Sequence, residues 1–258
     1  MVFWINCTGR YIVTHNFQYE SVGKDIGWDF SDVHVHTEGE KWNFYELVAD
    51  RLNHDHLWLD LASGSGEKII PHAEICCLLV GSDITNSMIE KANENIRKSG
   101  HGNIRFVQFD ASVRIDFPDE FFDIITVRHG PFNPGEVARI LKQNGVFLTQ
   151  QVEYRDKENF RDYFGRHQMM ESNSLSAAKH ARSFKDLEFS DIFLDEYNAD
   201  EYYEREEDIL FLLQHTPIVP DFGQNRPDTD SLKSFVRDNK TEKGIRTNSH
   251  RSLLIAKK

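Results

Sequence analysis

The stretch LWLDLASGSG, residues 57–66, decides the fold class, because an apolar run ends in a carboxylate and is followed by a turn of small residues. Near-continuous apolar runs are typical of strands in a parallel sheet that has helices on both faces. Gly64 and Gly66 carry no Cβ atom, so the backbone there can approach a ligand closely. Amide groups at the start of a following helix favour a negatively charged or polar ligand group. The stretch therefore predicts a strand, a turn and a ligand site.

The alternation of strand and helix continues beyond this stretch. Strands are predicted at 57–62, 78–84, 104–110, 123–127 and 145–152. One helix is predicted to start at Thr85 or Asn86 and to end at Gly100. Alternation of this kind indicates an α/β fold built on a doubly wound, mostly parallel sheet.

Two other helices carry prolines near their starts. Asn133 is predicted to cap a helix that has Pro134 in its first position and ends at Asn144-Gly145. Pro71 follows Gly66 after only a few residues, so the helix after the glycine turn is predicted to be short.

An acidic residue ends each of the first three predicted strands: Asp60, Asp83 and Asp110. Ligands of an open parallel sheet bind outside the carboxyl ends of its strands. A carboxylate at Asp83 can accept both hydroxyls of a ribose, and one at Asp110 can accept an exocyclic amine such as that of adenine. The three acids together indicate a site for a nucleoside-containing cofactor.

Two other functions use similar features. A nicotinamide-dependent oxidoreductase, binding NAD(P), also has a glycine turn followed by an acid. Its third glycine would fall at position 69, where Ile69 is found, and it has no particular need for Asp110. A third possibility is a protein that binds a cofactor without transferring any group.

Four segments resemble class I S-adenosylmethionine-dependent methyltransferases: DLASGSGE (60–67), SDITNSMIEKA (82–92), FVQFDA (106–111) and the stretch 117–152. GWDFSD (27–32), KWNFYELV (41–48) and SHRSLLIAKK (249–258) are more loosely similar to a bacterial subgroup of these enzymes whose substrate is unassigned. The resemblance implies a seven-stranded, Rossmann-like methyltransferase fold with S-adenosyl-L-methionine as the cofactor.

The resemblance also implies nine cofactor-binding positions: Asp60, Ala62, Gly64, Gly66, Asp83, Ile84, Met88, Asp110 and Ala111. Asp60 and the two glycines would surround the methionine part of the cofactor. Ala62 replaces the family's usual first glycine, and it keeps the turn if its φ angle is negative.

Further roles come from the residues that follow the second, third and fourth strands. Ile84 and Met88 would pack on the adenine, and the amide of Ala111 would bind its edge. Arg128 and His129 follow the fourth strand, at the position that faces the transferable methyl group in the family. His129 is the candidate general base, needed only if the acceptor must lose a proton. Arg128 would contact the cofactor or an anionic substrate.

Composition limits the partners. The 258 residues carry a formal net charge of −12, which disfavours a nucleic-acid substrate because such binding normally needs a basic surface. A small-molecule acceptor is expected. No window approaches the ~18 consecutive apolar residues that span a bilayer. Cys7, Cys76 and Cys77 form no disulfide pattern, which indicates a reducing, cytoplasmic location. The oligomeric state stays open.

Some remaining features have simple explanations. The histidine pairs in HVH (34–36) and HDH (54–56) lack the other ligands of a metal site, so no metal is expected. The acidic run 195–208 is interpreted as a solvated face. Four aromatic residues outside the core could line an acceptor pocket or only pack the cap: Trp28, Trp42, Tyr202 and Tyr203.

The chain is thus predicted to have four parts. Residues 1–56 form an N-terminal cap, and residues 57–153 form the cofactor-binding α/β core. Residues 154–245 add a substrate cap with late helices and a strand, and residues 246–258 form a C-terminal edge strand.

Overall fold

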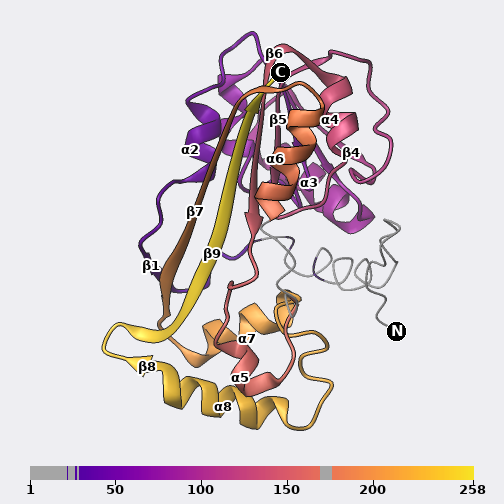
Figure 1. Cartoon of the computed structure of the whole chain (residues 1–258). Coiled ribbons are helices and arrows are strands. Elements are labelled where there is room, and N and C mark those ends of the chain that lie inside the picture. Colours follow the sequence, from indigo (N-terminus) through magenta and orange to yellow (C-terminus); the bar gives the residue numbers. More distant parts are fainter. Residues whose placement is uncertain (1–21, 23–26, 28, 169–175) are drawn as a thin grey trace.

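The computed structural model describes Val22, Gly27 and the ranges 29–168 and 176–258. One nine-stranded sheet organises this part of the chain (Figure 1). Its spatial order is β1-β7-β9-β6-β5-β2-β3-β4, with β8 paired to β9. The strands are β1 (Val35–Glu38), β2 (Leu57–Leu61), β3 (Leu78–Asp83), β4 (Ile104–Gln108), β5 (Phe122–Arg128), β6 (Leu141–Val152), β7 (Ser190–Tyr203), β8 (Lys240–Thr241) and β9 (Gly244–Lys257).

The strands β2 to β6 pair in parallel, which confirms the predicted doubly wound core. Strand β2 lies between β3 and β5, so the order of strands along the chain reverses at β2. Within this register, Asp60 lies opposite Gly81 on one side and Thr126 on the other. The carboxyl ends of β2, β3, β4 and β5 therefore share one edge of the sheet, where ligands of such folds bind.

The C-terminal strand is not an edge strand, so that prediction was wrong. Strand β9 pairs antiparallel with β6 on one side and with β7 on the other. The acidic run 195–208, interpreted as a solvated face, instead begins inside β7, where Tyr197, Ala199 and Glu201 are buried and the residues between them are more exposed. Within the acidic run, Glu201 and Asp208 are buried and pair with Lys157 and Arg205. Strands β1 and β8 raise the number from the expected seven to nine.

The helices cover both faces of the sheet and also form a separate group. They are α2 (Phe44–Ala49), the 3-10 helix η1 (Ile70–Ile75), α3 (Asn86–Ser99), α4 (Pro134–Ile140), α5 (Phe160–Phe164), α6 (Ser176–Asp186), α7 (Glu206–His215) and α8 (Asp228–Asn239). The predicted boundaries of α3 are confirmed, with Thr85 as N-cap and Gly100 at a φ of 77° after its end. The segment containing Pro71 is short, as predicted, and it is a 3-10 helix.

Helix α4 begins as predicted and ends four residues early. The Asn133 side chain accepts hydrogen bonds from the amides of Gly135 and Glu136. The helix stops at Ile140, because Leu141 already pairs with Phe122 as the first residue of β6. Tertiary pairing with β5 therefore overrides the end that Asn144-Gly145 suggested.

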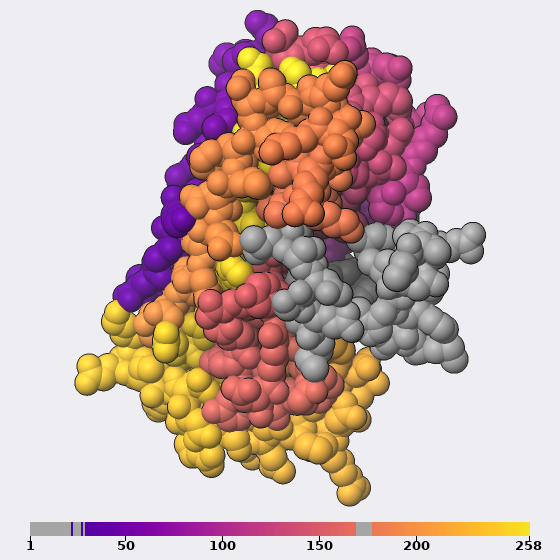
Figure 2. All heavy atoms as spheres, viewed as in Figure 1, coloured from indigo at the N-terminus to yellow at the C-terminus, as the bar shows by residue number. Residues whose placement is uncertain are grey.

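Three apolar clusters hold the elements together. Val137 of α4 and Phe184 of α6 pack on one face of the sheet, and Phe44 of α2 packs with Trp58 on the other. The long strands β7 and β9 lead down to α5, α7 and α8, which have a core of their own (Figure 1). Figure 2 shows this lower group in yellow and salmon, below the orange surface of α6.

Candidate cofactor site at the strand ends

Asp60, at the end of β2, is 1% exposed and only partly satisfied. Thr126 accepts a hydrogen bond from the Trp58 indole at 2.8 Å and donates its own hydroxyl hydrogen to Asp60 Oδ1. Asp60 Oδ2 has no hydrogen-bond partner within the described part of the chain. Burial raises the pKa of Asp60 from 3.8 to about 7, against the lowering effect of the Thr126 and Ser63 hydroxyls. A buried carboxylate oxygen without a donor is the feature expected of a site that binds a cationic group.

The glycine turn after β2 is tied to the end of β3. The amide of Ser63 donates to the Ser82 carbonyl at 2.7 Å, and the amide of Gly64 donates to Asp83 Oδ2 at 3.1 Å. Gly64 and Gly66 have φ angles of 58° and 82°, which favour glycine. The structure thus brings the predicted turn and the second predicted acid into direct contact.

Ala62 departs from its expected conformation. Its φ is 55°, so the condition of a negative φ is not met. A left-handed backbone costs an alanine roughly 1–2 kcal/mol. A Cβ atom added at Gly130 would lie 2.4 Å from the Ala62 Cβ, so the glycine at 130 leaves the space that the alanine fills.

Asp83 uses most of its acceptor capacity within the protein. Oδ1 accepts from the amide and the hydroxyl of Thr85, at 3.0 and 2.9 Å, while Oδ2 accepts from Gly64. A carboxylate offers about four acceptor positions, so little of this capacity remains for a ligand. Burial raises the pKa of Asp83, while the hydrogen bonds from Thr85 and Gly64 lower it. Binding of two ribose hydroxyls would need one of these bonds to be replaced.

The predicted adenine-binding residues differ in accessibility. Ile84 is 39% exposed, whereas Met88 is 2% exposed and offers little surface to a ligand in this structure. Asp110 Oδ1 accepts from the amide and hydroxyl of Ser112, which closes the turn after β4. Ala111 is buried, and its carbonyl accepts from the amide of Asn133.

Arg128, at the end of β5, lies beside Asp60 and a residue that sequence reasoning missed. Its guanidinium lies 5.8 Å from the centre of the Tyr45 ring. It makes no hydrogen bond or ion pair with any other residue that the structure describes. Burial and the charge of Asp60 raise the pKa of Tyr45 well above 10, and the charge of Arg128 opposes the rise of both the Tyr45 and the Asp60 pKa. Tyr45 stands in the segment KWNFYELV, so its position in the resemblance was the signal that could have identified it. A carboxylate oxygen without a donor and a nearby unpaired guanidinium fit the ammonium and carboxylate groups of an amino-acid tail.

His129 follows Arg128 with a φ of 59°, an uncommon conformation for a residue other than glycine. Its Nε2 lies 3.0 Å from the Nε2 atom of Gln150. The side chain is exposed, although protein surrounds the ring on most sides. Desolvation, together with the charges of Arg128, Arg251 and Lys157, holds the pKa of His129 well below its usual 6.5.

Of the four aromatic candidates, Trp42 alone is linked to these residues among those that the structure describes. Its indole donates to Gln150 Oε1 at 2.8 Å. Tyr202 and Tyr203 are buried at the lower end of β7, which agrees with packing. Trp28 lies outside the described residues.

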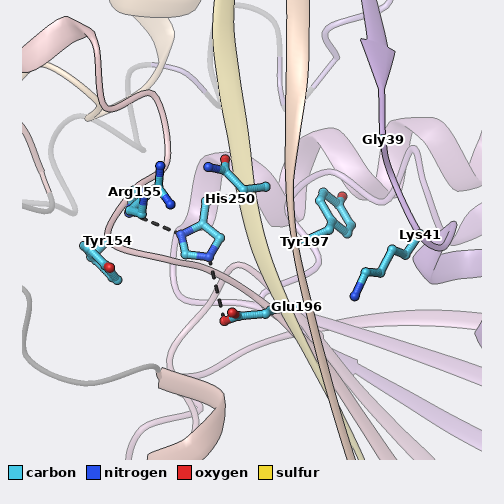
Figure 3. Close-up of a pocket in the computed structure, with 8 residues that line it drawn as sticks. Gly39, Lys41, Tyr154, Arg155, Glu196, Tyr197 and His250 are labelled. Atoms are coloured by element: carbon cyan, nitrogen blue, oxygen red, sulfur yellow. Dashed lines mark hydrogen bonds and ion pairs between the residues drawn. The ribbon is translucent and has the colours of Figure 1, made fainter.

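A separate hollow of about 450 Å³ lies around β7 and β9 (Figure 3). His250 accepts there from the Arg155 amide at 3.3 Å and lies 3.8 Å from Glu196. None of the sequence-predicted site residues lines it; its lining consists of Gly39, Lys41, Tyr154, Arg155, Glu196, Tyr197, Asn198 and His250.

Three of the four histidines in the HVH and HDH segments contact other side chains. His34 contacts Arg205 at 2.7 Å, His36 contacts Glu38 at 3.2 Å, and His56 contacts Asn53 at 2.7 Å. Across the described ranges no group of three or more His, Cys, Asp or Glu side chains could hold a metal ion. None of the described helices has the length and apolar character needed to cross a bilayer.

Comparison with known proteins points to one family. The family model of the methyltransferase domain matches residues 53–208. The uncharacterized methyltransferase YcgJ of Bacillus subtilis is 31% identical over 174 residues, covering 64% of this chain and 65% of that protein. The ubiquinone/menaquinone biosynthesis C-methyltransferase UbiE of Proteus mirabilis is 31% identical over 119 residues, covering 42% and 47%. The chain thus spans about half to two thirds of these curated relatives.

Solved structures share the fold. The crystal structure of YcgJ from Bacillus subtilis has a TM-score of 0.61 at 21% identity and covers 83% of this chain and 97% of that one. The [4+2]-cyclase SpnF has a TM-score of 0.55 at 16% identity and covers 93% and 91%. At these identities the likeness shows the fold alone. Because the family model matches more than half of the residues, the chain belongs to the methyltransferase-domain family.

Proposed function

We propose that this protein is an S-adenosylmethionine-dependent methyltransferase that acts on a small-molecule acceptor. Two neighbouring groups carry the proposal: within the described residues, Asp60 Oδ2 is buried without a hydrogen-bond partner, and the Arg128 guanidinium, whose charge acts on Asp60, forms no ion pair. The cofactor's amino-acid tail has an ammonium for the first group and a carboxylate for the second. A nicotinamide dinucleotide has no such tail.

The remaining predicted residues are assigned around this tail. Gly64 and Gly66 let the backbone lie against the methionine part, and Asp83 accepts from the ribose with its remaining capacity. Ile84 supplies exposed apolar surface for the adenine, and Asp110 follows the neighbouring strand β4. Ala62, Met88 and Ala111 stay proposed neighbours of the cofactor.

The bound cofactor supplies an electrophilic methyl group on a sulfonium. The protein has to orient the acceptor and exclude water around it, which are the main contributions of a protein to cofactor chemistry. His129 directly follows β5 and is assigned to the acceptor side. The formal net charge of −12 favours a small molecule over a nucleic acid. The likeness to a cyclase shows that this fold also supports other reactions, so turnover has to be measured with acceptors.

The amino-acid tail can be tested by calorimetry with two ligands. S-adenosylhomocysteine carries the tail, and 5′-methylthioadenosine lacks it. Asp60→Asn and Arg128→Gln should each weaken binding of the first ligand roughly 10- to 100-fold, from the loss of about 1.5–3 kcal/mol of charge-assisted bonding. Affinity for the second ligand should stay the same.

The exposed Arg97, on α3, provides a matched control. Arg97→Gln removes the same charge and should leave both affinities unchanged. If Asp60→Asn and Arg128→Gln lowered the affinity for both ligands equally, the two residues would not bind the amino-acid tail. Absence of binding by the unchanged protein would reject the cofactor itself.

A further inference from the structure

Gln150 connects Trp42 of the N-terminal segment to His129 of the candidate site. It lies near the end of β6 and is 3% exposed. Its Oε1 lies 2.8 Å from the Trp42 indole nitrogen, and its Nε2 lies 3.0 Å from His129 Nε2. These contacts form one chain of hydrogen bonds through a buried amide.

The direction of this chain is fixed by chemistry. An indole N–H can only donate, so the side of Gln150 that faces Trp42 must be its oxygen. The NH₂ group of Gln150 therefore faces His129 and donates to Nε2. That ring nitrogen must be unprotonated, and a neutral imidazole then carries its proton on Nδ1.

Backbone contacts hold the segment after β5 against β6, and desolvation and nearby positive charges keep the His129 ring neutral. The amide of His129 donates to the Gln150 carbonyl at 2.9 Å, and Gln151 Nε2 donates to the Gly130 carbonyl at 3.0 Å. Protonation of the ring is also opposed by the positive charges of Arg128, Arg251 and Lys157. The histidine thus has its lone pair occupied and one N–H left to donate.

We propose that Gln150 and Trp42 are positioning residues that hold His129 as the neutral Nδ1–H tautomer, so that it serves the methyl acceptor as a hydrogen-bond donor and not as a base. This proposal rests on the proposed methyltransferase function and replaces our expectation of a general base. A neutral histidine whose Nε2 is occupied cannot take up the acceptor's proton without losing the bond from Gln150.

The proposal defines a class of acceptor. The nucleophile must arrive without a proton that His129 has to remove, as in a phenolate, an enolate or a carboxylate. Its electron pair forms the bond to the methyl carbon, the carbon–sulfur bond breaks, and the electron pair of that bond stays on sulfur. The anion and the sulfonium become neutral together. The Nδ1–H of His129 suits an oxyanion on such an acceptor.

The tautomer can be read from long-range ¹H–¹⁵N spectra of the histidine rings, with no cofactor present. A His129→Gln spectrum assigns the resonances, and the exposed His54 serves as internal reference. The unchanged protein should carry its proton on Nδ1 at pH 7. A proton on Nε2, or a doubly protonated ring, would overturn the proposal.

Two variants test the positioning residues separately. Gln150→Glu offers only acceptors, so the proton of His129 should move to Nε2. Trp42→Phe keeps an aromatic ring against Tyr197 and removes the N–H that orients the amide, so a fraction of the Nε2–H form should appear. If the ¹⁵N shifts of His129 stayed unchanged in one of these variants, the substituted residue would have no positioning role. The shifts of His54 should stay the same in both variants.

Acetate and its neutral counterpart acetamide test the charge of the acceptor, added to the complex with S-adenosylhomocysteine. Acetate alone should shift His129 Nδ1 in a saturable way. Equal responses to the two, or no response, would reject an anionic acceptor. The tautomer result needs no ligand, so it can fail or hold independently of the methyltransferase function.

Discussion

Asp60→Asn should change how stability depends on pH. Burial raises the folded-state pKa of Asp60 from 3.8 to about 7. A folded-state pKa above the unfolded-state value means that the folded protein binds the proton more tightly. Asp60 therefore contributes its full stability below pH 3.8, and that contribution is lost as the pH rises to about 7.

The size of this effect follows from the shift. One pKa unit corresponds to about 1.4 kcal/mol, so the complete shift of about three units costs the folded state roughly 4 kcal/mol at pH 8. About two of those units fall between pH 5 and pH 8. Over this interval the unchanged protein should lose roughly 3 kcal/mol that the variant does not lose.

Urea unfolding at pH 5 and pH 8, followed by fluorescence, measures this difference. The stability of the variant relative to the unchanged protein should rise by roughly 3 kcal/mol between the two pH values, whatever its absolute stability. The exposed Asp55 gives the control, since Asp55→Asn makes the same exchange at the surface. If the difference in stability between Asp60→Asn and the unchanged protein were equal at both pH values, burial would not destabilise the ionised carboxylate of Asp60.

Three further changes test local features by urea unfolding. Gly130→Ala should cost roughly 1–3 kcal/mol alone but less than about 1 kcal/mol when combined with Ala62→Gly, because the colliding Cβ is then absent; equal costs in both backgrounds would contradict the contact. Asn133→Ala should cost about 1 kcal/mol through loss of the α4 cap, and no loss would mean that the cap is not used. Glu201→Gln should cost roughly 3 kcal/mol, because it leaves the buried Lys157 ammonium without its closest anion, and a neutral result would contradict that pairing.

Much of the fold could be predicted because it depends on local patterns. The apolar runs of the parallel strands, the Asn133 cap and the glycine after α3 each specify their element within a few residues. The end of α4 could not be predicted, because Leu141 pairs with Phe122 of β5, nineteen residues earlier in the chain. The position of β9 inside the sheet was not predicted for a related reason. Its partner β7 contains acidic residues, so no strand was predicted there.

The candidate site was predictable in its residues and less so in its interactions. The sequence places Asp60 and Asp83 at strand ends, but it cannot indicate that the Gly64 amide already occupies one oxygen of Asp83. The φ of Ala62 depends on the space left by Gly130, a contact between distant segments. The sequence predicted only that Gln150 lies in a strand, because its proposed role depends on contacts with Trp42 and His129 that form on folding.

We propose above all that the residues at the carboxyl ends of β2, β3 and β4 bind S-adenosylmethionine. Calorimetry of the unchanged protein with S-adenosylhomocysteine and, separately, with NAD tests it directly. We expect one saturable site for S-adenosylhomocysteine and no measurable binding of NAD. Binding of NAD without binding of S-adenosylhomocysteine would contradict it and would favour an oxidoreductase.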